Sequence, residues 1–263
     1  MSMRVAAIGD NCIDVYPKLG RQYPTGNAVD FAVNIRKLGF PTSLISVTGS
    51  DQNGRWMLDT LKAEGIDISH VRVGNGATAI TYMDMNGKDR VHGQYVEGVL
   101  ADLVFTPEEV DFAARHDLVH SAFWGKADGN LPGLKAHGAL ISFDYATQKD
   151  DPLVARTLPY VDYAFFSLKP AEAEAFLKDA WKQGPKVVIG TFGMDGSAAY
   201  DGERFYYFGI YPARVENTIG AGDAYMAGFL AAVLRGKSLD EALRSGAKVA
   251  AEVVEVFEPW VKN

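Results

Sequence analysis

The stretch NTIGAGDAYMAGFLAAVL, residues 217–234, joins a glycine-rich turn to an apolar helix. The Gly-Ala-Gly turn at residues 220–222 lets the backbone approach a ligand closely. The helix that begins there presents free N–H groups and the positive end of its dipole to that ligand. We therefore expect an anion, most often a phosphate, at this turn.

Asp223 opens the same helix, where the dipole stabilises a carboxylate. From that position the carboxylate could accept a proton from a hydroxyl group within reach. Phosphoryl transfer demands little of its base until late in the reaction, so an ordinary carboxylate suffices. The alternative is that Asp223 only caps a helix after a glycine turn, and the turn alone does not decide between the two.

Outward from this stretch, apolar runs of β type alternate with amphipathic helical runs. The predicted buried strands are Arg4–Ile8, Ser43–Val47, Leu118–Ala122, Leu140–Phe143, Val161–Phe166 and Val187–Thr191. The predicted helices are Ala28–Leu38, Arg55–Glu64, Pro107–Arg115 and Ala171–Gln183, and capping boxes mark helix starts at Thr106 with Glu109 and at Ser238 with Glu241. This alternation predicts an α/β fold with a mostly parallel sheet covered on both faces. Such sheets bind ligands beyond the carboxyl ends of their strands.

One segment interrupts the alternation. Thr78–Met85 and Arg90–Val96 flank Asn86-Gly87, and Asn-Gly is the strongest short signal for a hairpin turn. Together with Cys12–Tyr16, this hairpin is expected to form a small extra sheet over the strand ends. We interpret that sheet as a lid whose pocket-facing residues are Arg90, His92, Tyr95 and Glu97. The alternative is a surface hairpin without a function.

Composition excludes several classes of protein. The 263 residues include 26 Lys and Arg against 33 Asp and Glu, and the net charge of −7 argues against a nucleic-acid or anionic-membrane partner. The apolar run Phe229–Leu234 is far shorter than the roughly 20 residues that span a bilayer. No N-terminal segment resembles a signal peptide. The single cysteine, Cys12, excludes an intramolecular disulfide framework and fits a reducing compartment, so we expect a cytoplasmic protein.

Two segments imitate nucleotide-binding motifs. Residues 235–238, RGKS, resemble the end of a P-loop, but Ala231 stands where that motif needs glycine. Residues 74–79, GNGATA, match the dinucleotide fingerprint, but a strand-like run follows them instead of a helix. We interpret both as turns. A third segment, Thr191–Ser197, follows a strand, and its glycines either let a nucleotide lie against the backbone or form a plain turn.

Other titratable side chains give weaker signals. Glu172 and Glu174 begin a helix, where they need no function, although either could reach a Mg²⁺ ion. His116 and His120 have metal-like spacing, but one ends a helix and the other lies in a strand, so we expect structural roles. Cys12 has no cationic neighbour in the sequence and is interpreted as a small buried residue.

Motifs along the whole chain match one family in the same order. They are residues 9–14 (GDNCID), Gly26–Ala28, Leu38-Gly39, Val47–Asp51 with Gly54, Glu64–Asp67, Thr191–Ser197 and Thr218–Asp223. With these motifs the chain resembles the ribokinase (PfkB) family of sugar kinases. The resemblance implies a three-layer α/β/α ribokinase-like domain over residues 1–263. It also implies a small β-sheet lid formed by about residues 11–20 and 77–97.

The resemblance implies the use of ATP and Mg²⁺ and assigns roles by position. Asp223 would deprotonate the acceptor hydroxyl group, and the anion hole for the transferring phosphoryl group would be Gly220, Ala221 and Gly222. The other implied site residues are Thr191, Gly193 and Gly196 near the nucleotide, Glu172 near the metal, and Asp14, Gly26, Asn27 and Asp30 in the sugar site. The implied partners are a sugar, ATP and a second copy of this chain paired through the lid.

The chain departs from the family pattern at three positions. The family usually has Asp where Asn217 stands, and because that residue often helps to bind a monovalent cation, K⁺ activation is in doubt. Lys169 replaces an asparagine of the metal region and either neutralises phosphate or points to solvent. Asp30 replaces an asparagine of the sugar site, and an acidic residue there favours a cationic or donor-rich substrate.

Within the family, the chain is most similar to kinases that act on fructoselysine, a ketose that carries an amine. The segments that carry this similarity are Gly9–Tyr16, Asp67–Val71, Asp89–Val91 with Tyr95, Glu97–Val99, Ala101-Asp102, Val119-His120 and Trp124-Gly125. The reaction that it implies is transfer of the γ-phosphoryl group of ATP to a primary hydroxyl group of such a ketose.

The lid and the pocket supply further candidates for substrate binding, namely Arg90, Glu97 and Trp124. A carboxylate such as Glu97 or Asp30, or the ring of Trp124, could hold the ammonium group of the substrate. Two other functions stay open. One is a kinase for an unmodified sugar or a nucleoside, such as fructose, ribose or adenosine. The other is a catalytically weak sugar- or nucleotide-binding protein, which only Lys169 and Asn217 support.

Overall fold

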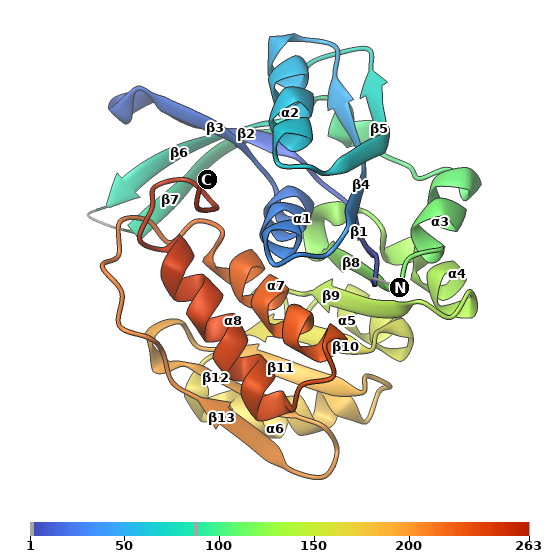
Figure 1. The fold of residues 1–263 in the computed structure, drawn as a ribbon, viewed down its shortest axis with the longest axis vertical. Coiled ribbons are helices and arrows are strands. Elements are labelled where there is room, and N and C mark those ends of the chain that lie inside the picture. Colours follow the sequence, from blue (N-terminus) through green and yellow to red (C-terminus); the bar gives the residue numbers. More distant parts are fainter. Residues whose placement is uncertain (1–2, 87–88, 263) are drawn as a thin grey trace.

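A nine-stranded sheet forms the centre of the computed structural model, which describes residues 3–86 and 89–262 (Figure 1). Its strands, in spatial order, are β13 (Phe205–Phe208), β12 (Ser197–Tyr200), β11 (Val187–Thr191), β10 (Tyr163–Ser167), β9 (Leu140–Asp144), β8 (Leu118–Ala122), β1 (Val5–Ile8), β4 (Thr42–Gly49) and β5 (Asp67–Gly74). All six predicted strands are present. The edge strands β5 and β13, and β12 beside β13, were not predicted.

The central strands pair in parallel, and the direction of winding changes at β1. This strand pairs with β4 on one side and with β8 on the other. At one edge, β12 pairs antiparallel with both β11 and β13. In doubly wound sheets, ligands bind beyond the carboxyl ends of the strands where the winding changes direction. That place in this fold lies beyond Ile8 of β1 and Ala122 of β8.

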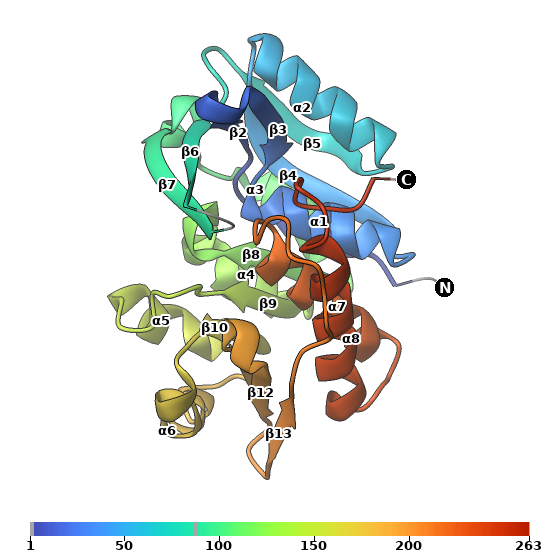
Figure 2. The same ribbon diagram turned by 90° about the vertical axis from the view of Figure 1, so that its left-hand side faces the viewer.

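Helices cover both faces of the large sheet (Figure 2). They are α1 (Asn27–Lys37), α2 (Gln52–Ala63), α3 (Pro107–Ala114), α4 (Leu131–Ala136), α5 (Pro152–Thr157), α6 (Pro170–Trp181), α7 (Ala221–Leu234) and α8 (Leu239–Val253). One core is shared by α1, α2, α7 and α8 and the other by α3 to α6. The predicted three-layer α/β/α arrangement is confirmed.

Helix α7 is the most deeply packed helix of the site. It lies between α1 and α8, and the residues from Asp223 to Ala232 are all buried. A Cβ atom at Gly228 would lie 2.7 Å from the Ser245 carbonyl oxygen, so a glycine here lets α7 and α8 approach closely. Because α7 is enclosed in this way, its first turn carries a carboxyl group into the interior.

Two predicted capping boxes are confirmed. At α3 the Thr106 hydroxyl accepts the Glu109 N–H at 3.2 Å, and the Glu109 carboxylate accepts the Thr106 N–H at 2.8 Å. At α8 the same exchange joins Ser238 and Glu241. The RGKS segment forms the turn between α7 and α8, and the GNGATA segment leads into a strand, as predicted.

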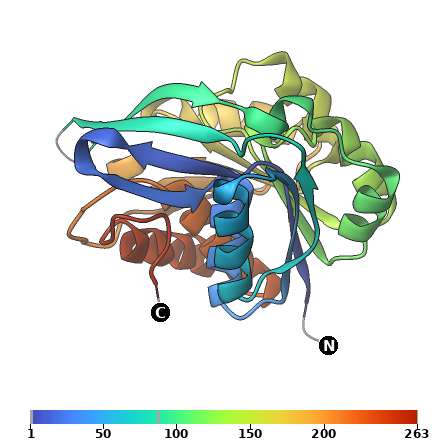
Figure 3. The same cartoon turned by 90° about the horizontal axis from the view of Figure 1, so that it is seen from above.

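A second, four-stranded sheet stands off one side of the large sheet. In spatial order its strands are β3 (Arg21–Thr25), β2 (Cys12–Tyr16), β6 (Ile80–Asn86) and β7 (Asp89–Val96). Figure 3 shows it extending away from α3 and α4, the helices coloured green. The predicted hairpin and its pairing with Cys12–Tyr16 are confirmed. Gly87, in the predicted turn, lies outside the described residues. Within the described part of the chain, no helix is long and apolar enough to cross a bilayer.

Candidate active site

The two glycines at the start of α7 differ in whether the fold requires them. Gly220 caps the helix with φ +68°, and a Cβ atom there would lie 2.6 Å from the Pro259 carbonyl oxygen, so the fold itself requires glycine. Gly222 lies inside the first turn, where a Cβ atom would meet no atom within 4 Å. Alanine would stabilise a helix at that position by about 0.5–1 kcal/mol. The fold therefore does not require the glycine at 222.

The loop before this turn is fixed by Asn217. This side chain is fully buried; its amide nitrogen donates to the Phe257 carbonyl oxygen at 2.9 Å, and its amide oxygen accepts the Ile219 N–H at 3.1 Å. The amide nitrogen thus joins the loop to the C-terminal segment, and the amide oxygen holds the loop's own backbone. The uncharged Asn217 amide therefore has a hydrogen-bond partner at both its nitrogen and its oxygen.

The Asp223 carboxyl group is buried, with 8% of the residue exposed, and its Oδ1 atom accepts no hydrogen bond from the described residues. Burial raises the pKa of Asp223 well above its ordinary value, and the charges of Asp144 and Asp10 raise it further. Arg90 acts in the opposite direction on this pKa. A carboxylate with a raised pKa and a free oxygen is suited to accept a proton.

Asp223 belongs to a group of five carboxyl groups that affect one another electrostatically. They are Asp10, Asp14, Asp30, Asp144 and Asp223, called the acidic cluster below. They come from five places: the loop after β1, strand β2, the first turn of α1, the end of β9 and the first turn of α7. The acidic cluster therefore lies at the carboxyl ends of the central strands, where a ligand is expected.

Burial dominates the titration of the acidic cluster. Burial raises the pKa of Asp14 to about 6, although the Thr81 hydroxyl and Arg90 lower it. Burial also raises the pKa of Asp144 to about 6, against the hydrogen bond that the Ala146 N–H donates to its Oδ1 at 2.8 Å. The cluster thus holds less negative charge near neutral pH than its five side chains would carry in water.

Arg90 joins the small sheet to the glycine-rich turn. Its guanidinium group donates to the Thr218 carbonyl oxygen at 2.9 Å and lowers the pKa values of Asp14 and Asp223. Apolar contacts run beside this bond, where Ile219 packs with Tyr16, Tyr23 and Met83 of the small sheet. The small sheet therefore lies directly against the loop that precedes α7.

The residues predicted for the sugar site from the start of α1 lie beside the acidic cluster. Gly26 caps α1, and the Asn27 N–H donates to Asp10 Oδ2 at 3.1 Å. Asp30 follows in the first turn, where its Oδ2 accepts the Thr25 hydroxyl at 2.8 Å. The helix start thus connects two members of the cluster.

Glu97 and Trp124 have other surroundings. The Glu97 carboxylate pairs with Lys126 at 3.1 Å, and 45% of its side chain is exposed. Trp124 is half-exposed and packs edge-on against Phe123. Neither residue is among the groups that most affect the pKa values of Asp14, Asp30 and Asp223.

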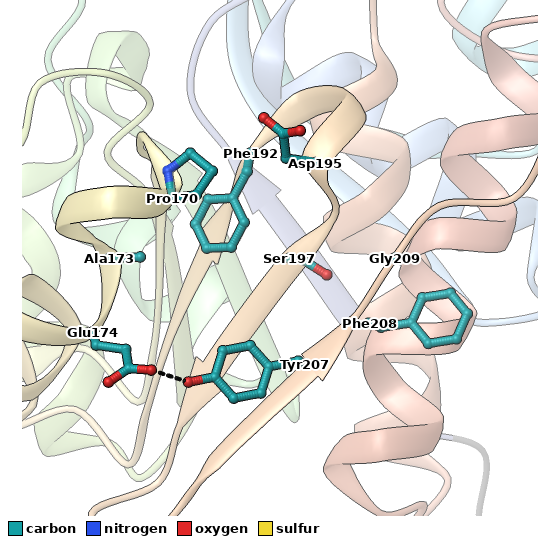
Figure 4. A pocket seen from close by; sticks show the side chains of 9 residues that line it. All are labelled: Pro170, Ala173, Glu174, Phe192, Asp195, Ser197, Tyr207, Phe208 and Gly209. Atoms are coloured by element: carbon teal, nitrogen blue, oxygen red, sulfur yellow. Dashed lines mark hydrogen bonds between the residues drawn. The ribbon is translucent and has the colours of Figure 1, made fainter.

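The three predicted nucleotide residues lie on one turn beside an open groove. Thr191 ends β11, and Gly193 and Gly196 bound the turn that leads into β12. Gly196 has φ +91°, and a Cβ atom there would lie 2.3 Å from the Phe208 carbonyl oxygen, so the turn itself requires this glycine. The groove has a volume of about 340 Å³ and is lined by Pro170, Ala173, Glu174, Phe192, Asp195, Ser197, Tyr207, Phe208 and Gly209 (Figure 4).

Glu172 lies in the first turn of α6, as predicted for a helix start. It accepts the Lys169 N–H at 3.3 Å and pairs with the Lys149 ammonium group at 3.2 Å. Within residues 3–86 and 89–262, no three His, Cys, Asp or Glu side chains are grouped as a metal-binding set. Glu172 alone is compatible with Mg²⁺, because this ion often takes one or two carboxylates together with phosphate and water oxygens.

The histidines and the cysteine have structural surroundings. His120 is buried, stacks on Phe31 and bonds to the Ser142 hydroxyl at 3.0 Å. His116 bonds to the Ser43 hydroxyl at 3.0 Å. Burial raises the pKa of the Cys12 thiol, which keeps it protonated and unreactive.

No sequence motif indicates a role for Asp144 or Lys149, and Asp10 stands in a motif without a role of its own. Asp144 is the last residue of strand β9, and Asp10 lies two residues after the end of strand β1. A carboxyl group just beyond a parallel strand was therefore the signal that could have found both. No comparable signal exists for Lys149, which reaches Glu172 from a loop 23 residues away.

Comparison with known proteins places these features in one family. Residues 4–259 match the family described as pfkB family carbohydrate kinase. A fructoselysine 6-kinase of Shigella flexneri is 39% identical over 259 residues, which cover 97% of this chain and 99% of that protein. A fructosamine kinase of Bacillus subtilis is 34% identical over 263 residues, which cover 97% of this chain and 92% of that protein.

Solved structures share the fold. A structure of Arabidopsis thaliana ribokinase complexed with ribose and ATP superposes with a TM-score of 0.86 at 22% identity. The superposition covers 98% of this chain and 94% of that one. The expected ribokinase-like fold is confirmed.

Replacing Gly222 with alanine is expected to separate stability from ligand binding. The helix should gain about 0.5–1 kcal/mol, while the added methyl group displaces the anion at the turn. A displacement on the order of 1 Å costs about 100-fold in turnover. Thermal unfolding and ATP turnover measure the two effects. Gly133→Ala is the control, because this exposed glycine lies in α4 with open space around it. Unchanged turnover of Gly222→Ala would contradict an anion at this turn.

Replacing Asp144 with asparagine is expected to shift the acidic limb of kcat/KM to lower pH. The variant keeps an Oδ1 acceptor for the Ala146 N–H but removes the charge that raises the pKa of Asp223. A base with a lower pKa stays deprotonated, and active, at lower pH, and kcat/KM reports the free enzyme. Asp179→Asn, on the exposed face of α6, should leave the limb unmoved. A limb that stays in place in Asp144→Asn would show that Asp223 does not set it.

Proposed function

The chain belongs to the pfkB family of carbohydrate kinases and is an ATP-dependent phosphotransferase, and from that premise we propose that it phosphorylates fructoselysine or a similar amine-modified ketose at a primary hydroxyl group. The main structural support for this reaction is the buried carboxyl group of Asp223 at the start of α7. The substrate class is supported by two relatives, one named for fructoselysine and one for fructosamine.

Asp223 acts as the base in this proposal. Its free Oδ1 atom takes the proton of the acceptor hydroxyl group as the oxygen attacks the γ-phosphorus of ATP. The anion hole for the moving phosphoryl group is formed by the backbone N–H groups of Gly220, Ala221 and Gly222, where the dipole of α7 also favours negative charge. Asn217 and the C-terminal segment fix the loop that carries these N–H groups.

The nucleotide lies along the turn from Thr191 to Gly196 in this proposal. The open space at Gly193 lets a ligand touch the backbone, and the aromatic groove beside the turn is available to the rest of the nucleotide. When bound, Mg²⁺ offsets charge on the phosphate groups. Glu172 is the residue that would hold it, in exchange for its contact with Lys149.

The small sheet acts as a lid over the sugar in this proposal. Asp14 of β2 and Arg90 of β7 face the acidic cluster, and the start of α1 supplies Gly26, Asn27 and Asp30. The contact of Arg90 with Thr218 brings the lid against the loop before α7. A lid in this position excludes the water that would otherwise hydrolyse ATP.

A homodimer through the lid is supported by the exposed apolar residues of the small sheet. Tyr82, Val91 and Val96 lie on one face of this sheet, and each has 39–46% of its surface exposed. Grouped exposed apolar side chains mark interaction surfaces more often than free surface. We propose that a second copy of the chain covers them.

A substrate panel tests the proposed function. With Mg·ATP, we expect fructoselysine to be phosphorylated faster than fructose, ribose or adenosine, with product position read by NMR. Asp223→Asn should fold normally, because it removes a buried charge, and should lose about 10²- to 10⁴-fold in kcat, the usual contribution of a general base. Faster turnover of another acceptor by the wild-type enzyme would replace the substrate. Near-normal turnover by Asp223→Asn would remove the assigned base.

Turnover is expected to be independent of K⁺. The Asn217 amide already donates to the Phe257 carbonyl oxygen and carries no charge to attract a cation. Rates measured in potassium buffer and in a buffer with only a bulky organic cation should agree. A rate that rises with K⁺ concentration would contradict this expectation, and Asn217→Asp is the variant in which such a rise is expected to appear.

A further inference from the structure

Three oxygen atoms of the acidic cluster have no hydrogen-bond partner within the described part of the chain. They are Asp10 Oδ1, Asp30 Oδ1 and Asp223 Oδ1, and the three residues are only 2–8% exposed. A buried polar atom without a partner carries a large desolvation penalty, which is larger for a charged group. The assigned reaction uses Asp223 and leaves Asp10 and Asp30 unexplained.

Asp30 is the member with the least compensation. Its Oδ2 atom accepts the Thr25 hydroxyl at 2.8 Å, and apart from burial the groups that affect it most are three other carboxyl groups: Asp223, Asp14 and Asp10. Arg90, by contrast, is a main influence on Asp14 and Asp223. A buried carboxyl group surrounded by acids is the best receptor in the site for a cation that can donate hydrogen bonds.

The other candidate receptors are occupied or exposed. The Glu97 carboxylate already pairs with Lys126 at 3.1 Å and has 45% of its side chain in solvent, where water screens its charge. Trp124 is half-exposed. A helix start would stabilise the charge of Asp30 to some extent, but the dipole does not supply a partner for Oδ1.

We propose that Asp30, with Asp10 beside it, binds the ammonium group of an amine-bearing sugar and thereby separates such sugars from amine-free ones. This proposal rests on the proposed function, because it concerns the acceptor site of the same kinase. The ammonium group supplies both the positive charge and the hydrogen-bond donors that Asp30 Oδ1 and Asp10 Oδ1 lack. An amine-free ketose offers a hydroxyl group there, which leaves the charge uncompensated.

The test compares two sugars that differ in one group, fructose and 1-amino-1-deoxyfructose, together with fructoselysine. Steady-state kinetics with saturating Mg·ATP are measured for the wild type, for Asp30→Asn and for the control Glu97→Gln. Asp30→Asn should raise KM for both amine-bearing sugars about 10- to 100-fold, the usual effect of losing a hydrogen bond to a charged group. It should change KM for fructose and the three kcat values much less, so the readout is the ratio of kcat/KM for an amine-bearing sugar to kcat/KM for fructose. Glu97→Gln should leave every ratio unchanged.

Several outcomes would overturn the proposal. Equal losses on amine-bearing and amine-free sugars would make Asp30 a residue that only shapes the site. Unchanged selectivity in Asp30→Asn, or a selectivity loss in Glu97→Gln, would place the ammonium group elsewhere. Failure of the proposed function has a different signature: the wild type would then prefer an acceptor other than fructoselysine, whatever Asp30→Asn does to the ratio for 1-amino-1-deoxyfructose. Thermal unfolding of Asp30→Asn confirms the fold, and removal of a buried charge should not lower its midpoint.

Discussion

The burial of Asp10, Asp14, Asp30 and Asp223, with the partly buried Asp144 beside them, is the constraint on which the rest of the site depends. Each would be stabilised by water and repelled by the others, so each needs a partner that the fold must bring to it. The partners come from separate elements: the Thr25 hydroxyl for Asp30, the Asn27 N–H for Asp10 and the Ala146 N–H for Asp144. The compensation is incomplete, since three oxygen atoms have no partner among the described residues. The free protein therefore carries an electrostatic cost that a bound ligand can relieve.

The same constraint explains why the small sheet and the C-terminal segment meet at the start of α7. Arg90 brings a positive charge to the cluster from β7, and its bond to Thr218 fixes where that charge lies. Phe257 accepts the Asn217 amide and packs with the small sheet through Tyr16 and Tyr23. Any movement of the small sheet would change the loop before α7 and the charge near Asp223 together. The position of the small sheet and the protonation of Asp223 are thus physically coupled.

The sequence was sufficient for the elements whose cause is local. Buried parallel strands are continuous apolar runs, the capping boxes are patterns of four residues, and an Asn-Gly turn predicts a hairpin. Features that depend on distant contacts could not be predicted in this way. The pairing of Glu97 with Lys126 joins residues 29 positions apart, and no local pattern in the sequence predicts it. Similarly, Gly220 and Gly222 look equivalent in the motif, and only the position of Pro259 shows that one serves the fold.

Asp30 shows how far a single substitution in a family motif can be interpreted. From the sequence, an acid in place of the usual asparagine indicated only that a cationic substrate is favoured. In the structure Asp30 is buried, the Thr25 hydroxyl donates to one of its oxygen atoms, and the charged groups that affect it are acidic. An asparagine would hold the Thr25 contact without any charge, so the fold gains nothing from the aspartate. A residue that lowers stability and is not needed by the fold is best explained by its ligand. An ammonium group supplies both the opposite charge and the hydrogen-bond donor that Asp30 lacks.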